Sequence, residues 1–242
     1  QSTPLHDRYR QVGRDALGIM SEQLSLSGSD LTRILVEDAL SEMFLPADNI
    51  VRRLLSRMEH IMQAHDISAT TMAALLAPWN IRPAVFREPD RLTDYLTGEI
   101  LAALADWFYL SPEWLNGRVH YPLYRPGDWP ATQEIFCRII SARENMDIIL
   151  WHGFPFAGTH SGEYCGVLLR QKKEINNTII YPVLSLYPAR MDIEKEGWFQ
   201  MARKISPDIP VRAVTLTPAQ AEYLITGKIL PTALFRVPLS PW

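Results

Sequence analysis

The sequence predicts an all-α N-terminal half followed by an α+β C-terminal half. Before about residue 118, apolar residues recur at the three- and four-residue spacing of amphipathic helices. After residue 130, a single helical segment is followed by short runs rich in β-branched and aromatic residues, which is typical of strands. Between the halves, residues 119–130 contain three prolines and a Gly-Asp pair, and this pattern predicts a linker.

Composition places the chain among globular proteins. It has 242 residues, of which 47% are hydrophobic and 21% charged, so that a sizeable core is available. The sequence has no run of about 18 apolar residues and no apolar signal segment near its start, so we expect no membrane partner. Two cysteines are too few for a disulfide framework, which favours a reduced, cytoplasmic protein.

The charge distribution bounds the kind of nucleic-acid contact that is possible. The net charge is −3. Residues 1–49 carry four Arg against eight acidic residues, residues 50–118 seven against eight, and residues 119–242 thirteen basic against eleven acidic residues. Tight non-specific binding needs many cations on phosphates. The sequence therefore excludes that class and remains compatible with a dimer on one short operator.

The first half divides into two parts. Residues 31–40 have helical periodicity after the capping chemistry of residues 27–30, and Pro46 follows this helix. We therefore expect residues 1–49 to form a helical extension. A second helix is predicted over about residues 48–65.

Residues 104–117 (LADWFYLSPEWLNG) carry the most specific pattern. An amphipathic helix turns at residues 109–110, Ser111 and Pro112 start a new helix, and Gly117 ends it. This segment resembles the closing part of lambda-repressor-like (XRE-type) helix-turn-helix domains. The resemblance extends over residues 50–118, with Ser68 capping a second helix that Pro78 ends. Asn80 would then cap a third helix, IRPAVFR, before Pro89.

This resemblance implies a bacterial transcription regulator, a repressor that binds double-stranded DNA as a homodimer. In such a domain the third helix lies in the major groove and its neighbours hold phosphates. The implied contacts are Asn80, Arg82 and Arg87 on base edges, Thr70 and Thr71 on phosphates, and Arg53, Arg57 and Arg91 on the DNA backbone. The sequence departs from the family in the turn LLAPWNIRP, which holds two prolines and a tryptophan and is about two residues longer than usual.

The second half, residues 131–242, is predicted to be an α+β domain for dimerisation or sensing. A helix over residues 132–145 precedes four β-rich runs, and the second and third run, joined by KKEINN, predict a hairpin whose loop is longer than two residues. The last helix has the clearest caps: Thr217 is its N-cap, Pro218 is its first residue, Gln220 completes a capping box and Gly227 ends the helix.

His152, His160, Glu163 and Cys165 form the one candidate cluster for chemistry. These side chains are good zinc donors, and the alternative is that they are ordinary strand and loop residues. We predict no metal, no cofactor and no catalytic residue, because Ser161 is one position away from a nucleophile elbow and lacks a marked base. The aromatic residues of this half indicate either a pocket for a small-molecule or protein effector or simply a core.

Three functions follow in order. The first is a sequence-specific DNA-binding regulator whose C-terminal half dimerises or senses an effector. The second is a protein-interaction adaptor or antirepressor on the same helical domain, which the acidic first 49 residues favour. The third is an enzyme in residues 131–242, for which only the His/Glu/Cys cluster speaks.

Overall fold

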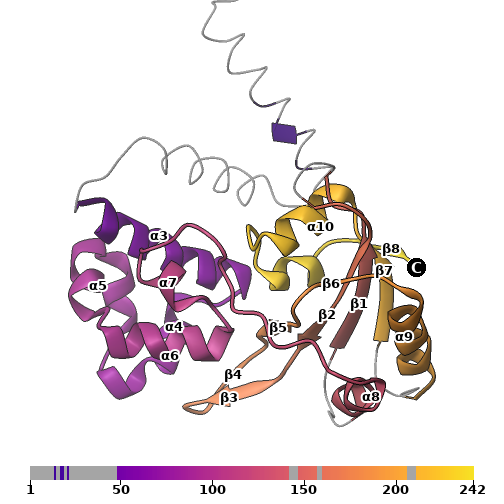
Figure 1. Cartoon of the computed structure of the whole chain (residues 1–242). Coiled ribbons are helices and arrows are strands. Elements are labelled where there is room, and N and C mark those ends of the chain that lie inside the picture. Colours follow the sequence, from indigo (N-terminus) through magenta and orange to yellow (C-terminus); the bar gives the residue numbers. More distant parts are fainter. Residues whose placement is uncertain are drawn as a thin grey trace, which may run out of the picture.

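The chain folds into two units that lie side by side (Figure 1). The computed structural model describes residues 48–141, 147–156, 160–205 and 211–242, together with Arg14, Leu17, Gly18 and Ser21. We call residues 48–118 the helical unit and residues 131–242 the sheet unit. Nearly all of the helical extension predicted for residues 1–49 lies outside the described residues.

Short local caps define the helical unit. Its elements are α3 (Asp48–Ala64), α4 (Ala69–Leu75), the 3-10 turns η1 (Ala77–Trp79) and η2 (Pro83–Arg87), α5 (Pro89–Tyr95), α6 (Gly98–Phe108) and α7 (Pro112–Leu115). The Ser68 hydroxyl accepts a hydrogen bond from the backbone N–H of Thr71, and the Ser111 hydroxyl accepts one from Trp114. Both predicted caps are confirmed.

The sheet unit is built on a mixed sheet of six strands. Its elements are α8 (Gln133–Ser141), β1 (Asp147–Gly153), β2 (Tyr164–Arg170), β3 (Lys173–Ile175), β4 (Thr178–Ile180), β5 (Val183–Ser185), β6 (Ala189–Arg190), α9 (Ile193–Ile205), β7 (Val211–Thr215), α10 (Pro218–Ile225), η3 (Pro231–Phe235) and β8 (Ser240–Pro241). The strand order is β5-β2-β1-β7-β8, and β6 also pairs with β2. Strand β1 runs antiparallel to β2 and parallel to β7.

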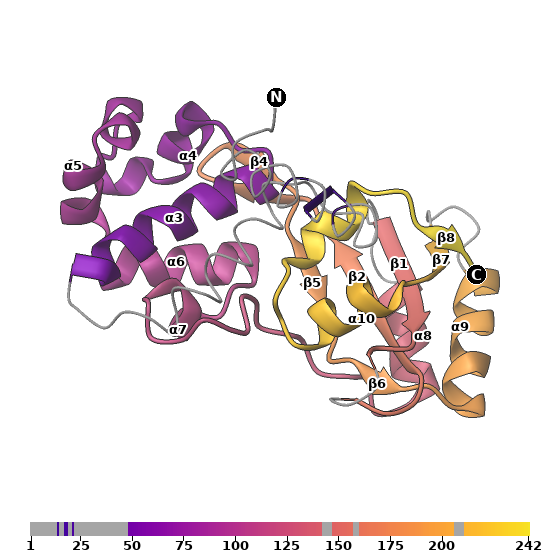
Figure 2. The ribbon, with the colours of Figure 1, turned by 90° about the horizontal axis from the view of Figure 1, so that it is seen from above.

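Both faces of the sheet are covered, which explains the continuous apolar run of β1. Helices α8 and α9 lie on one face, and α10 lies on the other face, toward the helical unit (Figures 1 and 2). Ile148 and Leu150 pack with α8 and α9, whereas Ile149 and Trp151 point to the other face. That second face belongs to the same hydrophobic cluster as the core of the helical unit. The two halves therefore share a core.

The predicted fold class is wrong. In place of a third helix, the segment after α4 forms only η1 and η2, and a mixed sheet dominates the second half. Pro78 is the second residue of η1, Pro83 is the first residue of η2, and Pro89 is the first residue of α5. Proline removes a backbone donor and disfavours an α-helical conformation at the residue before it. Prolines at intervals of five and six residues therefore leave room for single turns and for no longer helix.

Residues 119–130 are a packed part of the structure, not the predicted linker. Leu123 and Tyr124 are buried. The backbone N–H of Leu123 donates to the Gly227 carbonyl at 2.9 Å, and the Leu123 carbonyl accepts from Ser111 N–H at 3.1 Å. Gly227 has φ +70°, and a Cβ there would lie 2.3 Å from Cβ of Pro122. Only glycine fits this close approach.

The capping box of Thr217 and Gln220 is confirmed.

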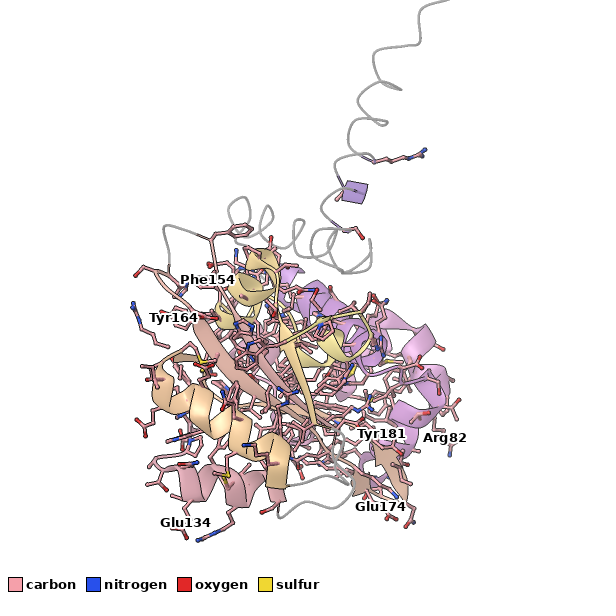
Figure 3. All side chains as sticks on the ribbon, turned by 90° about the vertical axis from the view of Figure 1, so that its right-hand side faces the viewer. Arg82, Glu134, Phe154, Tyr164, Glu174 and Tyr181 are labelled. Carbon is pink, nitrogen blue, oxygen red and sulfur yellow. The ribbon has the colours of Figure 1, made fainter. Side chains whose placement is uncertain are left out.

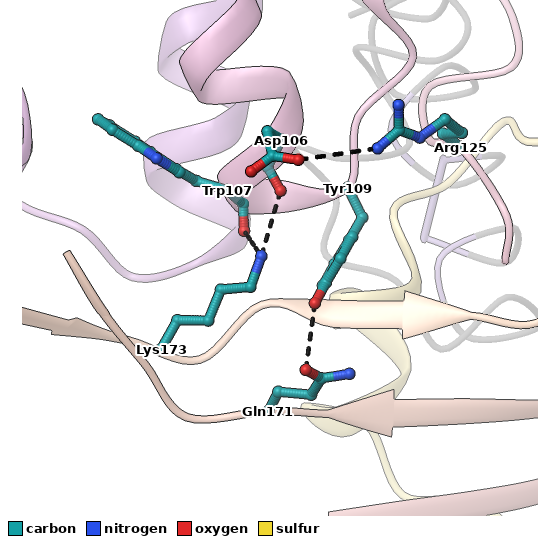
Figure 4. A network of polar contacts seen from close by, with 6 residues as sticks. All are labelled: Asp106, Trp107, Tyr109, Arg125, Gln171 and Lys173. Carbon is teal, nitrogen blue, oxygen red and sulfur yellow. Dashed lines mark hydrogen bonds and ion pairs between the residues drawn. The ribbon is translucent and has the colours of Figure 1, made fainter. Parts of the chain in front are cut away.

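The β3–β4 hairpin joins the two units. Its loop is shorter than predicted, because Asn176 and Asn177 form a two-residue turn with φ of 48° and 60°. The Asn176 amide donates to the Leu75 carbonyl at 2.7 Å, at the end of α4. The Lys173 ammonium donates to the Asp106 and Trp107 carbonyls at 3.2 and 3.3 Å (Figure 4). A cation therefore caps the C-terminal end of α6, where carbonyls have no helical partner.

Candidate functional site

Three of the predicted DNA-contacting residues meet at one groove on the helical unit. Thr70, Asn80 and Arg82 line a groove of about 310 Å³ beside α4. Asn80 ends η1 in the left-handed conformation with φ 55°, and Arg82 is extended because Pro83 follows it. Arg82 projects from the edge of the molecule (Figure 3). The groove thus combines a hydroxyl, an amide and a guanidinium group.

Arg82 is the available cation of this groove. It is exposed. No ion pair or side-chain hydrogen bond of Arg82 is found among the described residues. Thr70 is exposed as well, whereas the hydroxyl of Thr71 lies 2.9 Å from that of Ser68 in the cap of α4. Thr70, Asn80 and Arg82 can therefore bind a partner without breaking an internal contact.

The other predicted cations are differently placed. Arg57 is 3% exposed and its guanidinium donates to the backbone carbonyls of Trp114 and Val119, so it cannot reach a phosphate. Arg91 pairs with Glu88 at 3.2 Å on the surface. Arg53 is half-buried and takes part in internal contacts. The side chain of Arg87 lies outside the described residues. The predicted backbone contacts thus do not form one cationic surface.

A second polar site lies at the carboxyl ends of the parallel strands β1 and β7. His152 and Thr215 are register partners, and His152 Nε2 lies 2.8 Å from Thr215 Oγ1. On the other side of the ring, Nδ1 is hydrogen-bonded to the Glu163 carboxylate. The Trp242 ring covers the imidazole at a centroid distance of 4.3 Å, which leaves the His152 side chain 14% exposed.

This arrangement joins a hydroxyl, an imidazole and a carboxylate in one chain. Such a chain can pass a proton from the hydroxyl to the imidazole, because the carboxylate orients and stabilises the protonated ring. It also fastens β7 and the segment before β2 to the end of β1. Sequence reasoning missed Thr215 and Trp242, because their approach to His152 depends on strand pairing across more than 60 residues.

The predicted His/Glu/Cys cluster is assembled only in part. His152 is hydrogen-bonded to Glu163 and is the antiparallel register partner of Cys165, whereas His160 lies 3.5 Å from Glu222 of α10. Cys165 is buried, and burial raises the pKa of its thiol to about 12, so the free thiol is neutral at pH 7. Within the described ranges, no three His, Cys, Asp or Glu side chains are placed to hold a metal ion.

Within the part of the chain that the structure describes, every helix is too short or too polar to cross a membrane. Comparison with protein-family models, with curated proteins and with solved structures found no match to this chain.

Proposed function

We propose that this protein is a DNA-binding transcription regulator whose helical unit contacts DNA through the groove of Thr70, Asn80 and Arg82. The observation that carries the proposal is the meeting of these three exposed side chains beside α4. An arginine can bond guanine and an asparagine adenine, each with two hydrogen bonds, and a threonine hydroxyl can donate to phosphate. In this proposal the base-contacting side chains of Asn80 and Arg82 are carried by a turn and not by a helix inserted into the major groove. We propose that the protein acts in the cytoplasm.

One such groove reads few base pairs. We therefore propose a homodimer on a short palindromic site, in which the sheet unit brings the second copy and two half-sites share the specificity. Because few cations are available, operator affinity should fall only moderately as the salt concentration rises. The proposed sign of regulation is repression.

A gel-shift titration with the DNA upstream of the protein's own gene tests this function. Arg82→Ala should weaken operator binding by about 5- to 150-fold, the equivalent of 1–3 kcal/mol for a lost bidentate base contact. The matched control is Arg138→Ala, because Arg138 is an exposed arginine on α8 that pairs with Glu134 at 2.8 Å. Equal operator affinity of the Arg82 variant and the wild type would overturn the proposal.

The adaptor function is the second candidate. It is favoured by the engagement of two predicted phosphate contacts, since Arg57 is buried and Arg91 pairs with Glu88. A protein that binds another protein through the helical unit needs no surplus of cations. Absence of any gel shift at low salt would support this adaptor in place of the regulator.

A further inference from the structure

A cavity of about 580 Å³ lies between the two units. Its walls come from the end of α3 (His65), from α4 (Thr71), from the end of β2 (Arg170), from the segment after β4 (Tyr181) and from the region of η3 (Phe235, Arg236). This volume is in the range of small-molecule sites, which occur preferentially where domains meet. Helix α4 and strand β4 are in contact at this boundary, as seen in Figure 2.

Positive charge gathers around the ring of Phe235. The guanidinium carbons of Arg170 and Arg212 lie 5.0 and 5.5 Å from its centroid. Arg236 is adjacent in the chain and donates to the Gln63 carbonyl at 2.7 Å. Arg170 and Arg212 thus flank the Phe235 wall of the cavity, and Arg170 and Arg236 line the cavity itself.

The carboxylates nearby do not balance these cations. Arg170 pairs with Asp147, and Asp66 lines the cavity. Neither Arg212 nor Arg236 has a carboxylate partner among the described residues. Burial lowers the pKa of Arg170, and the nearby charge of Arg212 lowers it further. Three guanidinium groups therefore stand against two carboxylates.

The remaining walls define the rest of a ligand. Tyr181 and Ile179 are exposed at the cavity, at 55% and 45%, and Phe235 adds a third apolar wall. The hydroxyls of Thr71 and Thr232 also line it. His65 supplies no charge at neutral pH, because burial and Arg236 lower its pKa to about 3. The lining thus offers both guanidinium groups and aromatic surface.

We infer that this cavity binds a small organic anion whose acidic group meets Arg236 and Arg170 and whose aromatic body packs on Phe235 and Tyr181. Charge-assisted hydrogen bonds from arginine fix the acidic group. Thr71 lies on α4 next to Thr70, so a bound anion contacts the helix that carries the DNA-facing groove. Its role as an effector of DNA binding rests on the proposed function, whereas the binding itself does not.

A matched pair of fluorescent probes tests the binding. 8-Anilinonaphthalene-1-sulfonate is an aromatic anion, and N-phenyl-1-naphthylamine has the same rings without the sulfonate. The full chain should bind the anionic probe saturably at one site and bind the neutral probe more weakly. Arg236→Gln should weaken the anionic probe about tenfold or more and leave the neutral probe unchanged, since it removes a charged donor.

Further variants separate the outcomes. Tyr181→Ala should weaken both probes, because it removes an aromatic wall, and Arg138→Gln on α8 should affect neither. The site is overturned if the intact chain shows no saturable binding of the anionic probe, if both probes bind equally, or if Arg236→Gln binds like the wild type. Arg82→Ala should retain probe binding while losing operator binding. If the wild-type chain binds the anionic probe but no operator DNA, the proposed function is contradicted and the anion site is not. If it binds operator DNA but not the anionic probe, the anion site alone is contradicted.

Discussion

The Arg57 guanidinium donates a hydrogen bond to the Val119 carbonyl at 3.0 Å, across 62 residues of sequence. It also donates to the Trp114 carbonyl and lies 5.3 Å from the centroid of that indole ring. Arg57 thereby ties α3 to the chain on both sides of the end of α7. Arg57, which was predicted to contact the DNA backbone, instead stabilises the packing of the helical unit.

Arg57→Met should lower the free energy of unfolding by about 2–4 kcal/mol. The substitution keeps most of the apolar volume and removes hydrogen bonds from a charged donor, which leaves the buried Trp114 carbonyl and the part-buried Val119 carbonyl without that partner. Urea denaturation followed by circular dichroism measures the change. Arg82→Ala, at an exposed position, should stay within about 0.5 kcal/mol of the wild type. Unchanged stability of the Arg57→Met variant would contradict this structural role.

Asn80 allows backbone strain and recognition to be separated. Its φ of 55° disfavours residues with a Cβ, so Asn80→Ala should cost about 1 kcal/mol of stability and Asn80→Gly about 0.5 kcal/mol or less. Both variants lose the amide and should bind operator DNA more weakly than the wild type. The two readouts are thermal unfolding and the gel shift. If Asn80→Gly kept full operator affinity, the amide would have no part in recognition.

His65 should make the protein less stable in mild acid. Its pKa is lowered from 6.5 to about 3 in the folded state, so below pH 6.5 the unfolded chain binds a proton that the folded chain does not. The contribution of His65 to the free energy of unfolding is therefore fully present above pH 6.5 and is lost as the pH is lowered. At pH 5 the loss from this residue is about 2 kcal/mol.

Urea denaturation of the wild type and of His65→Gln at pH 7 and pH 5 measures this contribution. The variant should lose about 2 kcal/mol less than the wild type between the two pH values, because carboxylates titrate alike in both. Parallel losses in the two proteins would show that His65 is protonated as readily in the folded state as in the unfolded state.

The two cysteines should differ in reactivity. Cys165 is buried on β2 and burial raises its pKa to about 12, whereas Cys137 on α8 is half-buried. Iodoacetamide reacts with the thiolate, so Cys165 should label at least about tenfold more slowly than Cys137 at pH 8 in the native protein. Both should label alike in urea, which mass spectrometry of the digested peptides would check. Fast native labelling of Cys165 would contradict its burial.

Contacts within four residues of sequence were predictable. Ser68, Ser111 and Thr217 each accept a hydrogen bond from a backbone N–H three residues ahead, and the residue type and spacing are enough to place such a cap. These N-caps fix where α4, α7 and α10 begin. The absence of a third helix was also predictable from the sequence. The spacing of the prolines between α4 and α5 excludes the helix that the family pattern required there.

Sequence alone thus determined the N-terminal caps of α4, α7 and α10 and the strand character of β1, β2 and β7. Tertiary structure alone decided which polar groups are buried and which meet. The pairing of β1 with β7 brings Thr215 to His152, and the β3–β4 hairpin carries Lys173 and Asn176 to the helical unit. The physical reason is that a local pattern specifies hydrogen bonds within one turn, whereas burial of a cation such as Arg57 depends on carbonyls that lie about 60 residues away.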